Sequence, residues 1–168
     1  MRTRLDRKRT VVVRPTTKQD GTFKPVGFWY SVDGDWERWC RSDQPDWLDK
    51  KYVHQVELWT ERMLYIRSAS ELDLFHEKYK AGLMSVNWPQ VANEYDGIEI
   101  APYIWERRLC MGSGPEWYYS WDCASGCIWK PNGVKVILEN ENGHDRGEEE
   151  QAEVEPPGET QGTVRPQA

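Results

Sequence analysis

Two acidic residues, Glu99 and Asp122, stand among apolar and aromatic residues in the second half of the sequence. Glu99 lies between two isoleucines after an Asp-Gly turn, which predicts a strand, and the aromatic residues 117–121 predict a second strand that ends at Asp122. A carboxylate buried without a partner is strongly unfavourable, so each acid is either a hydrogen-bonded structural acceptor or a working group of a site. Both are candidate catalytic residues, and a structural role stays open for each.

Four residues nearer the N-terminus could form a nucleotide site with one of these acids. Arg14 ends a predicted strand, where its planar guanidinium could bind a phosphate. Trp29 and Tyr30 precede Ser31 in another predicted strand and could stack on a flat ring. A carboxylate can stabilise an oxocarbenium-like transition state, as in glycosyl transfer. These groups suit cleavage of the bond between nicotinamide and ribose in NAD, although an ion-paired Arg14 and aromatic residues in the core would be a structural alternative.

Composition divides the chain into a nearly neutral part and an acidic end. The 168 residues carry a formal net charge of −6, but residues 139–168 alone hold nine acidic and two basic side chains. Ten Trp, eight Tyr and three Phe predict an aromatic-rich core. The sequence contains neither a long apolar run nor a segment of signal-peptide type, so we expect a soluble, cytoplasmic (intracellular) protein without a membrane partner.

Three regions follow from the charge and periodicity of the chain. Residues 1–9 form a basic N-terminal arm, residues 10–138 a single domain, and residues 139–168 a disordered acidic tail. Within the domain we expect strands at 10–15, 28–32, 52–58, 63–66, 97–100 and 134–138, and helices starting near residues 35, 69 and 88. This order predicts an α+β fold of mostly antiparallel sheet with two or three short helices on one side.

The four cysteines (Cys40, Cys110, Cys123 and Cys127) are expected to be reduced in an intracellular protein. Cys123 and Cys127 could supply two zinc ligands, but no second pair accompanies them and the three histidines are scattered, so we expect no metal. The same loop could expose a nucleophilic thiolate, although no histidine lies near it in the sequence.

The order of these pieces resembles that of compact ADP-ribosyltransferases of the toxin and phage-effector type. In that family a first strand carries Arg or His, a second carries an aromatic-Ser or Tyr motif, and a late strand or its preceding loop carries Glu or Asp. The corresponding segments here are residues 13–17, 27–31 and either 97–100 or Asp122 before 126–129. The resemblance covers residues 10–138 and also implies that family's fold.

The resemblance implies NAD as the substrate that donates ADP-ribose. Arg14 would hold phosphate or ribose, Trp29 and Tyr30 would pack on nicotinamide, and Ser31 would support the arginine and the ribose. Either Glu99 or Asp122 would stabilise the oxocarbenium ion. The chain departs from the family pattern in having no Ser-Thr-Ser motif after its second strand and no Glu-x-Glu or Gln-x-Glu motif before a late strand. The acceptor would be an unknown protein or nucleic acid, and the enzyme would act as a monomer.

A non-catalytic binding module is the alternative. Residues 24–129 also resemble small uncharacterised proteins of phages and high-GC bacteria, which implies a context and no mechanism. Here a Trp-rich surface and the basic arm would contact a host protein or nucleic acid, and the acidic tail would mimic nucleic acid or increase solubility.

Overall fold

The computed structural model describes residues 1–16, 18–20, 23–50, 52–82, 84–110, 112 and 114–141. The strands are β1 (Arg2–Asp6), β2 (Phe28–Val32), β3 (Tyr52–Leu58), β4 (Met63–Ile66), β5 (Gly97–Ile100), β6 (Ser125–Ile128) and β7 (Val134–Glu141). The α-helices are α1 (Asp35–Asp43), α2 (Ala69–Tyr79) and α3 (Trp88–Glu94), and short 3-10 turns span Pro45–Leu48, Trp105–Arg107 and Glu116–Ser120.

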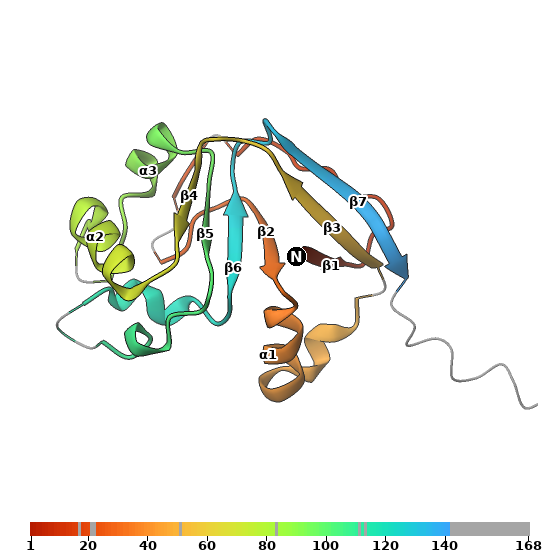
Figure 1. The fold of residues 1–168 in the computed structure, drawn as a ribbon, viewed down its shortest axis with the longest axis horizontal. Helices are drawn as coiled ribbons and strands as arrows, with labels where there is room; N and C mark the ends of the chain where they lie inside the picture. Colours follow the sequence, from red (N-terminus) through yellow and green to blue (C-terminus); the bar gives the residue numbers. More distant parts are fainter. Residues whose placement is uncertain are drawn as a thin grey trace, which may run out of the picture.

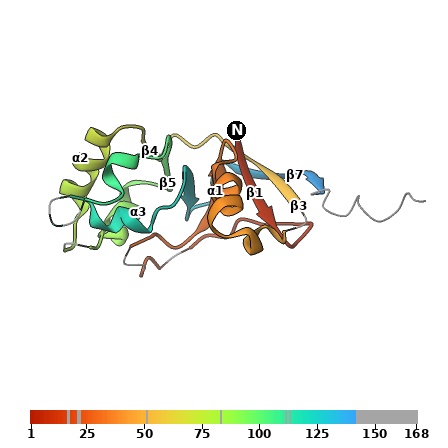
Figure 2. The same ribbon diagram turned by 90° about the horizontal axis from the view of Figure 1, so that it is seen from below.

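The strands form one open seven-stranded sheet in the order β4-β5-β6-β2-β1-β3-β7. Neighbouring strands are antiparallel except β4 and β5, which are parallel because α2 and α3 connect them. These two helices lie together beside β4 and β5, whereas α1 follows β2 and lies near β1 (Figures 1 and 2). The predicted α+β class with a mostly antiparallel sheet is therefore confirmed.

The N-terminal residues form a central strand where the sequence predicted a basic arm. β1 pairs with β2 on one side and with β3 on the other, and Thr3 is 4% exposed. The arginines of β1 are accommodated because each has partners: Arg2 binds Glu99, and Arg4 binds Asp6 and the Trp29 carbonyl oxygen. A run of basic residues does not reveal Glu99 and Trp29 as partners, because they come from distant parts of the chain.

The next segment, residues 10–15, was predicted as a strand and is not part of the sheet. Val11 and Val13 pack against the core while Arg14 is exposed. The Thr16 amide donates to the Trp129 carbonyl oxygen beyond the end of β6 (2.8 Å). The positions beside β2 are already filled by β1 and β6, so this β-branched segment has no free edge of β2 to join.

A second correction concerns the aromatic residues 117–121, which were predicted as a strand and lie largely in a 3-10 turn. The Tyr118 amide donates to Pro115 O and the Trp121 amide to Tyr118 O, both at 2.8 Å. Trp117, Tyr118 and Trp121 are each fully buried. These three residues are spaced i, i+1, i+4, as on one face of a helix. Because a residue between them is also aromatic, the helical period was not recognised in the sequence.

The helix boundaries agree with the capping residues in the sequence. Ser68 Oγ accepts a hydrogen bond from the Glu71 amide (3.3 Å), and Asn87 Oδ1 accepts one from the Gln90 amide (3.2 Å). Pro89 lies in the first turn of α3, where a missing N–H costs nothing. The predicted starts of α2 and α3 are thus confirmed. Among the described residues, no helix is long and apolar enough to cross a membrane.

The core is built around large aromatic side chains, as the composition predicted. Fully buried tryptophans lie on α3, in the Glu116–Ser120 turn and on either side of β6: Trp88, Trp117, Trp121 and Trp129. Phe75 of α2 contacts both Trp88 and Trp117, with ring centroids 5.9 and 5.4 Å apart. Edge-on and tilted ring pairs of this kind add to the stabilisation that burial provides.

The C-terminal strand is longer than predicted. β7 runs to Glu141, and its residues 140 and 141 pair with Val53 and Tyr52 of β3, so the sheet continues past the expected boundary at residue 138. The predicted acidic tail falls mainly on residues 142–168, which lie outside the described residues.

His76 should make the stability of the fold depend on pH. This α2 side chain is 9% exposed, its Nδ1 has no hydrogen-bond partner among the residues that the structure describes, and burial lowers its pKa. The unfolded chain therefore binds a proton at this histidine more readily than the folded chain does, so protonation favours unfolding as the pH falls. We expect the melting temperature to fall between about pH 7.5 and about pH 5.5, and to fall less in a His76→Gln variant. Equal falls in both proteins would contradict this prediction.

Candidate functional site

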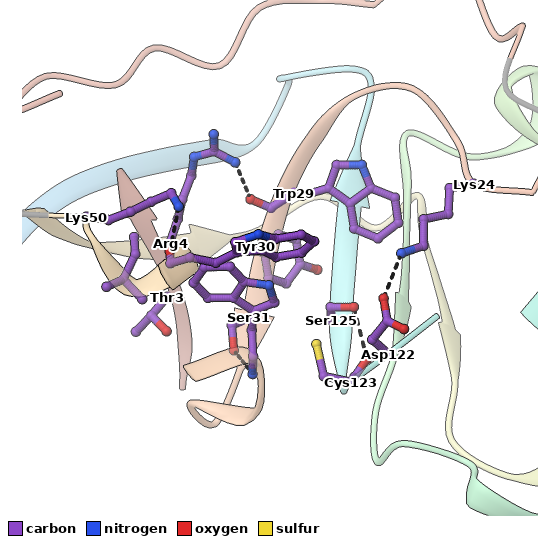
Figure 3. A pocket seen from close by; sticks show the side chains of 13 residues that line it. Thr3, Arg4, Lys24, Trp29, Tyr30, Ser31, Lys50, Asp122, Cys123 and Ser125 are labelled. Carbon is purple, nitrogen blue, oxygen red and sulfur yellow. Dashed lines mark hydrogen bonds and ion pairs between the residues drawn. The ribbon is translucent and has the colours of Figure 1, made fainter. Parts of the chain in front are cut away.

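A pocket of about 370 Å³ opens where β1, β2, α1 and the loop before β6 meet. Its lining combines aromatic rings, two lysines and one carboxylate, and Figure 3 shows these side chains from close by. The lining residues are Thr3, Arg4, Leu5, Lys24, Trp29, Tyr30, Ser31, Trp36, Trp47, Lys50, Asp122, Cys123 and Ser125. Four of the six candidate site residues chosen from the sequence are among them.

Strand β2 supplies three of those four residues. It lies between β1 and β6, with Ser31 opposite Thr3 on one side and opposite Ser125 on the other, so these three hydroxyl groups lie in a row across the sheet. Trp29 is half-buried and its ring packs on Trp121 at 4.9 Å. The core thus fixes the orientation of the indole that forms one wall of the pocket.

Asp122 is the carboxylate of this pocket. Its Oδ2 lies 3.3 Å from Lys24 Nζ, and 32% of its side chain is exposed. Small residues follow it, and the amide of Ala124 donates to Asp35 Oδ2 of α1 (2.7 Å). The loop that carries Asp122 is therefore held against the start of α1, which places a partly solvated acid beside the ring of Trp29 (Figure 3).

A hydrogen-bond network holds Ser31 at the floor of the pocket. Ser31 Oγ donates to Glu37 Oε2 (3.0 Å) and accepts from the Trp36 amide (3.0 Å). Thr3 Oγ1 donates to the other Glu37 oxygen (3.3 Å). Glu37 thereby joins β1, β2 and α1 below the cavity, and it is a second carboxylate near the site that sequence patterns did not identify.

Cationic side chains lie at two sides of the pocket. Lys24 Nζ is 5.5 Å from the ring centroid of Trp29, and Lys50 Nζ is 5.4 Å from that of Trp36. Figure 3 places these lysines at opposite ends of the drawn cluster. Positive charge beside half-buried aromatic rings suits a ligand that combines flat rings with phosphate groups. These lysines were missed because they come from loops far apart in the sequence and belong to no motif.

Cys123 lines the pocket as a thiol. It is 4% exposed, and burial raises its pKa to about 12. Burial also raises the pKa of Cys127, which is fully buried. A thiolate is the nucleophilic form of cysteine, so neither residue has the low pKa that the alternative of thiol catalysis requires.

Glu99 lies outside the pocket, in a buried cluster with Arg2 and Tyr30. Glu99 is 7% exposed; Arg2 Nη2 donates to its Oε1 (3.0 Å), and the Tyr30 hydroxyl donates to its Oε2 (2.8 Å). Burial, followed by the charge of Glu99, raises the pKa of Tyr30. Tyr30 therefore contributes to the wall of the pocket while its hydroxyl is bound to Glu99.

Arg14 is also separate from this site. It is exposed in the segment between β1 and β2 and does not line the pocket. The arginine that the structure places on the first strand at the pocket is Arg4. Its Nη1 donates to the Trp29 carbonyl oxygen (2.8 Å), and its guanidinium lies over the ring of Phe28.

Comparison with known proteins gives no match to a family model, to a curated protein or to a solved structure. In the part of the chain that the structure describes, no group of three or more His, Cys, Asp or Glu residues is placed to hold a metal ion.

Proposed function

We propose that the chain is an ADP-ribosyltransferase-like enzyme that cleaves the nicotinamide–ribose bond of NAD in this pocket. The observation that carries the proposal is the meeting of Trp29 and Ser31 from β2 with Asp122 from the loop before β6 in one cavity. An aromatic-Ser pair on an early strand and an acid before a late strand are two of the three pieces on which the resemblance to that family rests; the third, Arg14, does not line the pocket.

In this proposal each lining group has one task. Trp29 packs on the nicotinamide ring, and Asp122 stabilises the positive charge that develops at the ribose. The glycosidic C–N bond breaks with its electron pair going to the nicotinamide nitrogen, which leaves as a neutral amide. An oxygen or nitrogen of the acceptor then attacks the ribose carbon and loses its proton.

The diphosphate of NAD would lie against the positive charge of the pocket. Lys50 lines the cavity; its ammonium donates to the Trp47 carbonyl oxygen (2.6 Å) and lies 5.4 Å from the ring centroid of Trp36, where it can also bind a phosphate oxygen. Arg4 lies on the first strand, the position that the family resemblance gives to a ligand-binding arginine. Arg14 does not line the pocket, and the guanidinium of Arg4 is already bound to Asp6 and the Trp29 carbonyl oxygen, so we propose Lys50 rather than either arginine as the phosphate ligand.

Glu99 has a structural role in this proposal. Its two oxygens already accept hydrogen bonds from Arg2 and Tyr30, and it does not line the pocket. Asp122, with a third of its side chain exposed, is open to a ligand. The choice between the two candidate acids thus follows from burial and partners.

A binding module receives less support from the positions of the tryptophans. Four of the ten are fully buried in the core, and Trp29 and Trp36 line the pocket. Trp47, Trp59 and Trp105 are the exposed ones among the described residues, and of these Trp47 also lines the pocket. The chain's tryptophans thus serve mainly as core and pocket residues.

The test of the proposal is NAD binding and turnover. NAD is titrated into the purified protein while Trp fluorescence is followed, and release of nicotinamide is then assayed. We expect quenching, because Trp29, Trp36 and Trp47 line the cavity, together with slow release of nicotinamide. A folded protein that shows neither quenching nor release would refute the proposed activity.

Replacing Lys50 with Met should weaken NAD binding by about threefold to tenfold, because one charge-assisted hydrogen bond to phosphate is lost at a partly exposed site. The effect should shrink as salt is added, because mobile ions screen an exposed charge. The control is Lys18→Met, which removes an exposed lysine that is paired with Asp20. Equal affinities of the Lys50 variant and this control at low salt would exclude a role for Lys50 in phosphate binding.

A further inference from the structure

The backbone next to Lys24 is held in place by hydrogen bonds within its loop. The side-chain amide of Gln19 makes two hydrogen bonds to the backbone of Val26, with Nε2 donating to the carbonyl oxygen (2.7 Å) and Oε1 accepting from the amide (2.8 Å). Gln19 is 8% exposed, so water competes little for these bonds. The backbone on the C-terminal side of Lys24 is therefore anchored. The Lys24 side chain extends from this anchored backbone to the pocket.

The ammonium group of Lys24 lies where a cation is doubly favoured. It is 3.3 Å from Asp122 Oδ2 and 5.5 Å from the ring centroid of Trp29. A carboxylate beside an aromatic face forms a binding site for organic cations, since both the charge and the ring quadrupole attract positive charge. Figure 3 shows Lys24 beside Trp29 and Asp122 in this position.

We propose that Lys24 is an internal competitor for a planar cationic ring, which binds between Trp29 and Asp122 after displacing the lysine side chain. The assignment of that ring to the pyridinium of oxidised nicotinamide nucleotides rests on the proposed function. The reduced nicotinamide ring is neutral and gains nothing from Asp122, so the site selects the oxidised form. Lys24 thereby disfavours the binding of neutral ligands at this position. A neutral ligand cannot replace the interactions that the ammonium loses with Asp122 and Trp29.

The lysine side chain is able to move away from this position. Its side chain is 38% exposed, and among the described contacts its ammonium has Asp122 and Trp29 as partners. Exposed ion pairs and exposed cation–ring contacts are each weak, so a ligand can replace them at small cost.

The test uses two probes that differ in charge. The dissociation constants of 1-methylnicotinamide, a cation, and nicotinamide, its neutral counterpart, are measured by NMR titration for the wild type, Lys24→Met and the control Lys18→Met. We expect Lys24→Met to bind the cation about threefold to tenfold more tightly, because the competitor is gone. Affinity for the neutral probe should change less than about twofold, and the control should match the wild type.

The outcomes separate this inference from the proposed function. Weaker or unchanged binding of 1-methylnicotinamide to Lys24→Met would overturn the inference, even if the wild type releases nicotinamide from NAD. Weaker binding of NAD itself to this variant would also overturn it, since Lys24 would then be a phosphate ligand. Tighter binding of the cation without any turnover of NAD would uphold the inference and refute the enzymatic activity.

Discussion

Replacing Asp122 with Asn should lower the rate of nicotinamide release from NAD by about 10²- to 10³-fold. The substitution keeps the size of the side chain and removes the charge that faces the developing oxocarbenium ion. The affinity for NAD should change far less than the rate, because the charge matters most in the transition state. The measurement is single-turnover release of nicotinamide at saturating NAD, with affinity taken from Trp fluorescence.

The control for this variant is Asp20→Asn, which removes another exposed carboxylate paired with a lysine. Asp20 does not line the pocket, so its variant should release nicotinamide at the wild-type rate. Both variants should unfold at the wild-type denaturant concentration within error, because each breaks one exposed ion pair. If Asp122→Asn keeps full activity, the catalytic role proposed for Asp122 is wrong.

Local signals predicted the helices and most of the strands. Capping residues such as Ser68 and Asn87 act through backbone groups within the next turn, so the sequence around them contains the relevant chemistry. The edge strand β7 was likewise predicted as far as residue 138. Its last residues were missed because pairing with β3, and not composition, carries the strand to Glu141.

Non-local contacts explain the parts of the fold that were mispredicted. Arg2 belongs in the sheet because Glu99, 97 residues away, binds its guanidinium. Residues 10–15 have good strand propensity but no free place beside β2. Strand propensity mainly reports fit to a half-buried pleated surface, so it cannot decide which of two neighbouring segments occupies that surface.

The candidate site was predicted in part for the same reason. Trp29, Ser31 and Asp122 were identified from residue type and order, and the structure brings them together with Tyr30 in one pocket. The two candidate acids are Glu99 and Asp122. The positions of β5 and β6 relative to β2 in the sheet determine which of them faces the cavity. The sheet order puts β6 next to β2 and β5 beyond it, with Glu99 reaching Tyr30 inside the fold.

Replacing Glu99 with Gln should lower the free energy of unfolding by about 1–3 kcal/mol. The amide cannot pair with the charge of Arg2, and its NH₂ group would face either the guanidinium or the Tyr30 hydroxyl, both of which donate hydrogen bonds to Glu99. Glu99 is 7% exposed, so water cannot easily replace the lost partner. Urea denaturation followed by Trp fluorescence measures the change.

The matched control is Glu139→Gln, which neutralises an exposed glutamate on strand β7 and should leave stability within about 0.5 kcal/mol of the wild type. Below the unfolding transition, Glu99→Gln should still release nicotinamide from NAD at close to the wild-type rate, because its carboxylate does not line the pocket. The opposite pattern, with full stability and abolished release, would identify Glu99 as the catalytic acid. Asp122 would then serve as the partner of Lys24, so the two variants together decide which carboxylate does the chemistry.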